Sequence, residues 1–146
     1  MPSRTFQHAA IADAPIVTVW GALNDPKSWE SVPGVDRILE SVIDQEGQLQ
    51  RFTFESLAAG KRFLGRANPA GRELEKMMAW DIETSEILGL VIVRLRAIDD
   101  ATRVDVSLRM ESVGVLSSVF FPVIASAIGD GFPKTVQDFA NGLSQP

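Results

Sequence analysis

The segment from Val115 to Leu143 constrains the fold of this chain more than any other. Its apolar side chains recur mostly at steps of three or four residues, the spacing of one face of an α-helix. They are Val119, Val123, Ile124, Ile128, Phe132, Val136, Phe139 and Leu143. Most of the preceding chain alternates as strands do. A long apolar helix after many strands predicts a sheet that packs against it.

Length and composition are consistent with one ordinary core. The chain has 146 residues, of which 45% are hydrophobic. A chain of this length can bury about 68–70% of the surface that its unfolded form exposes, so we expect a single domain over residues 1–146. It contains no cysteine, which excludes disulfides, cysteine-ligated zinc and thiol nucleophiles.

Targeting signals and charge limit the expected location of the protein and the classes of partner that it can bind. We find no signal-peptide pattern, and the longest apolar stretch, Val113–Ile128, is shorter than the ~20 residues of a membrane span. A cytoplasmic protein is therefore expected. The net charge is −5, and the basic residues are scattered rather than clustered. Nucleic acids and anionic membrane surfaces attract clustered Lys and Arg, so both are disfavoured as partners.

The pattern along the chain predicts the order of elements. A strand over Thr5–Ala12 precedes a helix that starts at Pro15, and a second short helix has Asp25 as its cap and Pro26 at its first position and ends at Pro33-Gly34. Six more strands are predicted over Val35–Ile43, Leu49–Leu57, Lys61–Ala67, Glu73–Thr84, Ile87–Ile98 and Thr102–Val113. The short turns between them, including one at Asn68–Gly71, imply antiparallel neighbours.

Particular residues in this order point to a known superfamily. They are Ala14-Pro15, Val19-Trp20, Leu23-Asn24-Asp25-Pro26, Trp29 and Pro33-Gly34-Val35, then Trp80, Thr102-Arg103-Val104 and Gly114. In this order they resemble the START/birch-pollen-allergen-like superfamily, also called the polyketide cyclase/dehydrase and lipid-transport (SRPBCC) superfamily. The resemblance implies an α+β helix-grip fold: a curved antiparallel sheet of about seven strands around a long C-terminal helix, with two short helices after the first strand. Pro33-Gly34-Val35 is also similar to the branch of this superfamily that is associated with carbon monoxide dehydrogenase.

The resemblance also implies a ligand cavity between the sheet and the last helix. The candidate ligand-binding residues are Phe52, Phe54, Met78, Trp80, Val91, Val93, Val106, Leu108, Met110, Val123, Ile124, Ala127 and Ile128. The same apolar residues could equally form a plain core. Hydrophobic positions alone do not decide between a core and a pocket wall.

Candidates for catalysis are few. His8 is the only histidine, so a site with several histidine ligands is excluded, and tyrosine is absent. His8 is either a structural or solvated side chain or an acid–base group in the cavity; Asn24 and Arg96 are more distant candidates. The pairs Glu55 with Asp81 and Glu83 with Arg94 fall on the wet face of the predicted sheet. We therefore assign no catalytic residue, no metal and no cofactor.

Three functions remain open. The first is binding of a small apolar molecule or lipid, and the second is a polyketide cyclase/dehydratase-type enzyme that uses the same cavity. The third is an accessory protein that binds another protein. Gly129, Gly131 and Pro133 predict a kink or break near Asp130–Pro133, and we expect ligand access to depend on that segment. The oligomeric state is not predicted.

Overall fold

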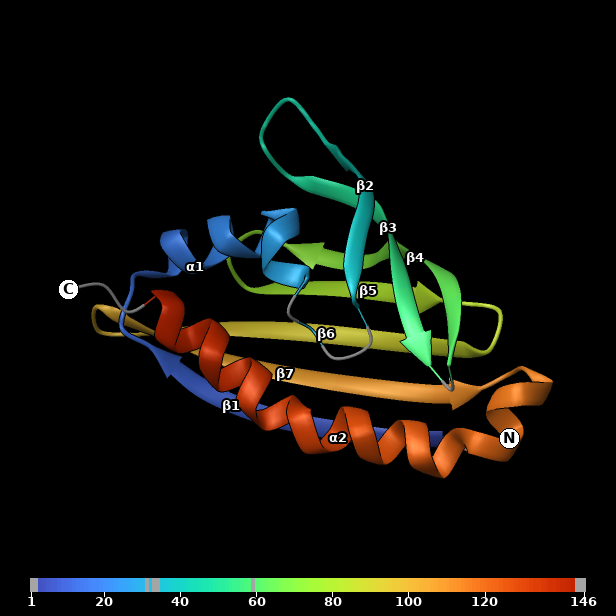
Figure 1. Ribbon diagram of the computed structural model, residues 1–146. Coiled ribbons are helices and arrows are strands. Elements are labelled where there is room, and N and C mark those ends of the chain that lie inside the picture. Colours follow the sequence, from blue (N-terminus) through green and yellow to red (C-terminus); the bar gives the residue numbers. More distant parts are fainter. Residues whose placement is uncertain (1–2, 31, 33–34, 59, 144–146) are drawn as a thin grey trace.

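The computed structural model describes residues 3–30, 32, 35–58 and 60–143. One long helix lies against a strongly curved sheet, and two short helices follow the first strand (Figure 1). The elements are β1 (Ser3–Ala12), α1 (Ile16–Leu23), the 3-10 helix η1 (Pro26–Trp29), β2 (Arg37–Ile43), β3 (Leu49–Ala58), β4 (Lys61–Glu73), β5 (Met77–Glu83), β6 (Ile87–Ile98), β7 (Ala101–Ser112) and α2 (Val115–Leu143). Pro33 and Gly34, predicted to end the second short helix, lie outside the described residues.

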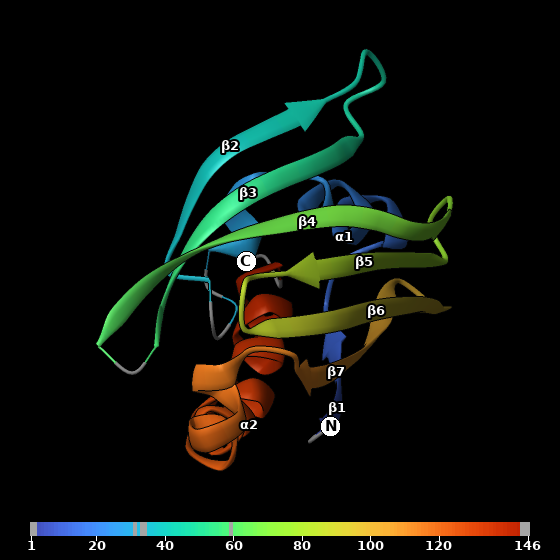
Figure 2. The same ribbon diagram turned by 90° about the vertical axis from the view of Figure 1, so that its right-hand side faces the viewer.

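The sheet has seven antiparallel strands in the order β1-β7-β6-β5-β4-β3-β2. Helix α2 lies along β1 and β7, while β2, β3 and β4 curl away from it on the other side (Figures 1 and 2). The predicted α+β helix-grip fold, with its two short helices, is confirmed. Because β2, β3 and β4 curl away from α2, the inner face of β5, β6 and β7 is covered by α1, η1 and α2.

Alternation along the strands divides inner from outer residues, as the sequence predicts. On β7, Val104, Leu108 and Met110 are buried, whereas Arg103 and Arg109 point to the opposite face. Each fully buried side chain of this size stabilises the fold by about 1.5–3 kcal/mol relative to an exposed one. Burial of one face of the sheet therefore fixes the register of every strand in it.

The turn predicted at Asn68–Gly71 is wrong. Strand β4 continues through these residues to Glu73, with a β-bulge between Pro69 and Gly71. A bulge tolerates a proline because it interrupts the ladder of hydrogen bonds, to which Pro69 has no N–H to donate. The chain turns later, where Glu75 has a φ of 58°, so β5 begins at Met77 instead of Glu73.

Of the kink or break predicted near Asp130–Pro133, the break is wrong, and a kink there stays a prediction. Helix α2 runs unbroken from Val115 to Leu143 with Pro122 and Pro133 inside it. Pro133 is exposed, whereas its neighbours Phe132 and Val136 are buried in the core. Burial of these side chains offsets the one helical hydrogen bond that each proline removes. Among the described residues no helix is long and apolar enough to cross a membrane.

Hydrogen bonds hold the segments that lead into α1, η1 and α2. The Thr102 hydroxyl, fully buried, donates to the carbonyl of Ala14 at 2.8 Å, and the Asp25 carboxylate accepts from the Lys27 N–H at 3.0 Å as the predicted cap of η1. At the other end, the Glu86 carbonyl accepts from the N–H groups of Val113 and Gly114 at 2.9 and 3.2 Å. These contacts anchor α1 and the start of α2 to the sheet.

Candidate functional site: an apolar cavity under Trp29

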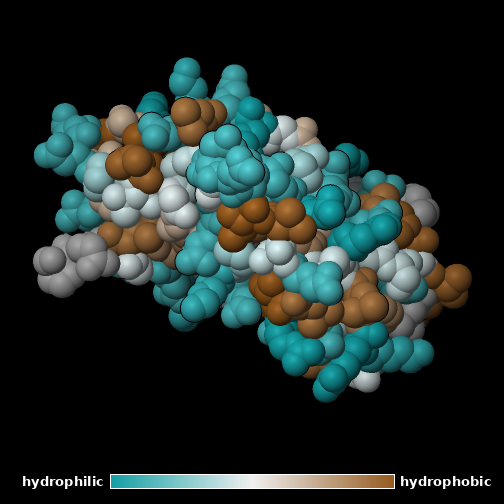
Figure 3. All heavy atoms as spheres, turned by 90° about the horizontal axis from the view of Figure 1, so that it is seen from above, coloured by the Kyte–Doolittle hydropathy of each residue, from teal (hydrophilic) through white to brown (hydrophobic). Residues whose placement is uncertain are grey.

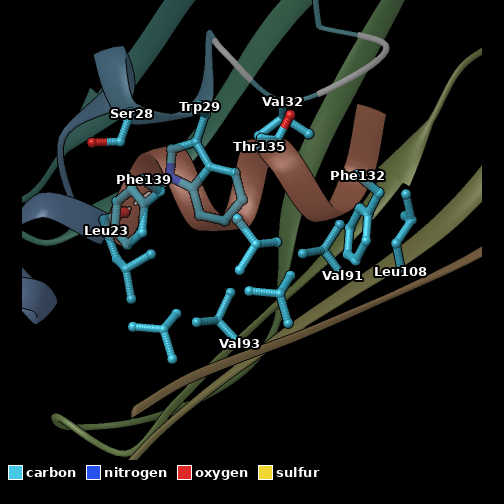
Figure 4. A pocket seen from close by; sticks show the side chains of 13 residues that line it. Leu23, Ser28, Trp29, Val32, Val91, Val93, Leu108, Phe132, Thr135 and Phe139 are labelled. Atoms are coloured by element: carbon cyan, nitrogen blue, oxygen red, sulfur yellow. Dashed lines mark hydrogen bonds between the residues drawn. The ribbon is translucent and has the colours of Figure 1, made fainter. Parts of the chain in front are cut away.

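A cavity of about 60 Å³ lies between the inner face of β6 and β7, the α1–η1 segment and the second half of α2. Figure 4 shows Trp29 facing Val91 and Val93 across it, with Phe132 and Phe139 contributed by α2. Its lining consists of Leu23, Ser28, Trp29, Val32, Val91, Val93, Val104, Val106, Leu108, Phe132, Thr135, Val136 and Phe139. Nearly all of this surface is hydrocarbon.

Strand register and helical spacing bring the lining together. The pairs Val93–Val106 and Val91–Leu108 are direct partners of β6 and β7, so their side chains stand next to each other on the inner face. On α2, Phe132, Val136 and Phe139 are spaced by four and three residues and share one face of the helix. Strands β6 and β7 therefore supply the floor of the cavity, and α2 supplies one side.

Trp29 forms the roof. Its indole N–H donates to the carbonyl of Leu23 at 2.9 Å, which fixes the ring above the valines. The ring also lies 6.0 Å from that of Trp80, in an edge-on arrangement, and 6.1 Å from that of Phe52. Aromatic pairs in such arrangements contribute about 0.5–1.5 kcal/mol beyond their buried area. A cluster of aromatic rings thus lies behind the cavity wall.

The residues predicted to bind a ligand fall into three groups. Val91, Val93, Val106 and Leu108 line the cavity. Phe52, Phe54, Met78, Trp80 and Met110 are buried in the surrounding core but are not part of this lining. On α2, Ile124 and Ile128 are half-buried, and Val123 and Ala127 are exposed. Contact of any of these side chains with a ligand stays a prediction.

Other residues of the lining are not among the ligand-binding candidates from the sequence. They are Leu23, Ser28, Trp29, Val32, Val104, Phe132, Thr135, Val136 and Phe139. Helical spacing does predict that Phe132, Val136 and Phe139 are buried, because all three belong to the apolar face that a covering helix must bury. No pattern in the sequence shows that η1 folds over the sheet and brings Trp29 into the interior.

The cavity offers little acid–base chemistry. The hydroxyls of Ser28 and Thr135 are the polar side-chain groups of its lining, and none of the thirteen lining residues is titratable. His8 is half-buried on β1, directly opposite Val106 in the register, but is not part of the lining. General acid–base catalysis needs a proton-transferring group within hydrogen-bond reach of the substrate.

The other charged candidates lie on the outer face. Glu55 forms ion pairs with Arg37 and Arg62 at 3.8 and 3.6 Å, and Glu83 pairs with Arg66. Arg96 is exposed. Ion pairs at the surface contribute about 0–1 kcal/mol. These charged groups therefore lie on the outer surface of the sheet and do not line the cavity.

Arg72 is the one cation held against the aromatic cluster among the described contacts. Its guanidinium lies 5.8 Å from the centre of the Trp80 ring and donates to the carbonyl of Leu49 and, at 3.2 Å, to Oε1 of Gln48. Burial lowers the pKa of Arg72 from its ordinary value, and the Asp44 carboxylate raises it in opposition. The side chain stays charged, and it joins β4 to the turn before β3.

Asn24 is a structural latch. Its side chain is buried, donates through Nδ2 to the carbonyl of Trp20 at 3.0 Å, and accepts at Oδ1 from the Leu49 N–H at 2.9 Å. The amide thus links the end of α1 to the start of β3. Its nitrogen and its oxygen each have a partner within the fold, which gives it a structural role.

We expect Asn24→Ala to lower the free energy of unfolding by about 2 kcal/mol, because it leaves the Leu49 N–H without its acceptor and removes one of the two donors to the Trp20 carbonyl. Urea unfolding followed by circular dichroism measures the change. A loss below about 0.5 kcal/mol, the level of an ordinary surface substitution, would show that the latch contributes little.

An exposed apolar row lies on the first half of α2. Val115, Val119 and Val123 are 85%, 69% and 70% exposed and are spaced by four residues, so they share one face. The hypothesis of an accessory protein requires an apolar surface of this kind. Figure 3 shows that, seen from above, the apolar surface of the molecule is divided into patches among polar residues.

No protein-family model matches the chain, and a search of the curated proteins finds no match. Solved structures do resemble it. The Zhui aromatase/cyclase from Streptomyces sp. R1128 has a TM-score of 0.69 at 12% identity, with 95% of this chain and 94% of that chain covered. A START superfamily protein from Mycobacterium smegmatis has a TM-score of 0.68 at 10% identity, with 96% and 99% covered. A polyketide-cyclase-like protein from Corynebacterium glutamicum has a TM-score of 0.63 at 17% identity, with 98% and 93% covered. Likeness at such identities concerns the fold.

Proposed function

Because this chain has the helix-grip fold of the START/birch-pollen-allergen-like superfamily, we propose that it binds a small apolar molecule in the cavity under Trp29. The single observation that carries the proposal is the hydrocarbon character of a space between the sheet and the helices that cover it. Pockets lined by apolar side chains with a few polar groups are the usual form of small-molecule sites. The hydroxyls of Ser28 and Thr135 are those few groups here.

The volume of the cavity limits the ligand or requires movement. At about 60 Å³, it is smaller than the ~150 Å³ of an engineered apolar cavity that accepts benzene. An aromatic or acyl ligand must therefore displace part of the lining or extend out of the cavity, which is partly open. The roof is the part of the lining held by the shortest element, because η1 is a single turn of four residues. We infer that Trp29 shifts outward when the ligand is bound.

Binding without turnover fits the lining better than a cyclase or dehydratase does. One structural relative is named an aromatase/cyclase, and an enzyme of that kind would use the same cavity. It would need a proton-transferring side chain beside the ligand. The thirteen lining residues contain none, and His8 lies outside them. Binding of a small apolar molecule is therefore the function that we propose.

Filling the cavity should weaken binding. We expect Val106→Phe to weaken the binding of 2-isopropylnaphthalene, an uncharged apolar probe, at least about tenfold. The added ring occupies the space that the probe needs, and steric overpacking of an apolar interior costs ~1–3 kcal/mol. Ser107→Phe is the matched control: the next residue along β7 faces the opposite side of the sheet and leaves the cavity unchanged. Isothermal titration calorimetry measures both dissociation constants.

Two results would contradict the proposal. One is the absence of any binding to the wild-type protein. The other is an equal effect of the two substitutions, which would place the probe outside the cavity. Native mass spectrometry of protein purified from its own host adds an independent measurement, since a bound apolar molecule would appear as a fixed additional mass.

A further inference from the structure

A buried hydrogen-bond donor without an acceptor lies directly behind the cavity wall. Trp80 is fully buried, yet its indole N–H has no hydrogen-bond partner within the described part of the chain. Buried polar groups in folded proteins are almost always paired, and an unpaired one costs about 1–3 kcal/mol. The N–H of Trp29 illustrates the usual case, because it donates to the carbonyl of Leu23. Trp80 and Trp20 are the two exceptions among the described residues, and Trp80 is the one whose ring adjoins residues of the cavity lining.

The position of Trp80 connects it to the cavity. It lies on the inner face of β5, and its direct partner on β6 is Val91, which lines the cavity. The ring of Trp80 also lies edge-on to the ring of Trp29, the roof, with 6.0 Å between the ring centres. Two residues of the lining thus adjoin Trp80. The outward shift of Trp29 that a ligand requires would extend the cavity towards this indole.

The groups around Trp80 supply no acceptor. The ring of Phe52 lies 5.5 Å away, and the guanidinium of Arg72, which lies over the indole at 5.8 Å, carries donors alone. The donors of Arg72 are in turn directed at the Leu49 carbonyl and Gln48. The missing acceptor is thus a group that residues 3–30, 32, 35–58 and 60–143 do not provide.

We propose that the natural ligand carries a neutral carbonyl oxygen, as in an aromatic ketone or a quinone, which accepts a hydrogen bond from Nε1 of Trp80. This inference rests on the proposed function and names the chemical class of its ligand. The apolar lining selects the hydrocarbon part. The indole N–H selects one oxygen at its edge, because a ligand without that oxygen leaves a buried donor unpaired. A neutral acceptor fits better than an anion, because none of the thirteen lining residues is charged and the donors of the nearby Arg72 are already directed at the Leu49 carbonyl and Gln48.

A second unpaired indole provides an internal control. Trp20, on α1, is also buried with its N–H unpaired among the described residues. Like Trp80 it is not part of the cavity lining, but unlike Trp80 it has no ring contact with Trp29 in the described part of the chain. Trp20→Phe therefore removes the same kind of buried donor at a position that the ligand does not reach.

The experiment uses two probes of similar size, 2-acetylnaphthalene and 2-isopropylnaphthalene, in which a planar C=O group of the first stands where the second has a CH–CH3 group. Calorimetry gives the ratio of their dissociation constants in the wild-type protein, Trp80→Phe and Trp20→Phe. We expect Trp80→Phe to shift this ratio about tenfold against the ketone, the effect of one buried hydrogen bond. Trp20→Phe should leave the ratio unchanged.

The outcomes separate this inference from the proposed function. If both probes bind and the ratio is the same in all three proteins, the carbonyl inference is overturned while cavity binding stands. If neither probe binds the wild-type protein, the proposed function fails with it. Should Trp80→Phe fail to fold, NMR spectra of the wild-type indole N–H groups decide. The ketone alone should move the Trp80 resonance downfield, and equal shifts with both probes would overturn the inference.

Discussion

Trp29→Ala is expected to lower the free energy of unfolding by about 3–5 kcal/mol, the usual cost of removing a buried tryptophan. The side chain is only 6% exposed, and its ring packs against Trp80 and Phe52. The substitution also leaves the carbonyl of Leu23 without its hydrogen bond. Urea denaturation followed by circular dichroism gives the change in stability.

The same substitution should enlarge the cavity. We therefore expect Trp29→Ala, provided that it is folded at low temperature, to be stabilised by 2-isopropylnaphthalene more than the wild-type protein is, since the probe fills the space left by the indole. Trp29→Phe is the control, because it keeps a ring in the roof while removing the N–H. A loss below about 1 kcal/mol in Trp29→Ala, far under the usual range for a buried tryptophan, would mean that the roof is not part of the core.

Gly129→Leu is expected to cost about 3 kcal/mol of stability, at the upper end of what overpacking costs. A Cβ at position 129 would lie 2.5 Å from the ring of Phe6, closer than side chains approach. Either Phe6 must move, which also disturbs its contact with Phe132 at 6.2 Å, or α2 must lift off β1. Thermal unfolding of the purified variant measures the effect.

Two further variants isolate the cause. Gly142→Ala lies on the same helix with nothing within 4 Å of its added Cβ, so it should stabilise the protein by a few tenths of a kcal/mol to about 1 kcal/mol. The double variant Phe6→Ala/Gly129→Leu should lose less stability than the sum of its two single variants, because the smaller side chain at position 6 makes room for the leucine. Strict additivity would refute close packing between α2 and β1 at this point.

The importance of Gly129 changes the interpretation of the last helix. From the sequence, glycines at 129 and 131 weaken α2 and predict a moving part. The helix is continuous, and Gly129 lies where α2 closely approaches Phe6 on β1. A residue without a side chain here serves close packing. We therefore expect the moving element to be the roof at η1 rather than the Asp130–Pro133 segment.

Alternation and helical spacing are enough to predict most of the elements. Strand β7 alternates cleanly and β6 is a long apolar run, and the predicted bounds of both differ from the observed ones by at most one residue at either end. The full length of β4 is not predictable in this way, because Pro69 and Gly71 are ordinary turn residues. Their accommodation in a β-bulge depends on the pairing of β4 with β5, which is a tertiary contact.

The site is harder to predict than the fold. Every inner-face residue looks alike in the sequence, whether it packs in the core, as Phe54 does, or lines the cavity, as Val93 does. What separates them is the placement of α1, η1 and α2 over one part of the sheet. That placement depends on single contacts such as Thr102 with Ala14 and Asn24 with Leu49, between residues 88 and 25 positions apart.

The most direct test of the central claim locates a bound probe. Methyl NMR of the protein with 2-acetylnaphthalene measures nuclear Overhauser effects between probe protons and valine and leucine methyl groups. Binding under Trp29 predicts effects to Leu23, Val93 and Val106, which line the cavity. Effects confined to Val119 and Val123, on the exposed face of α2, would place the probe on the surface and contradict the claim.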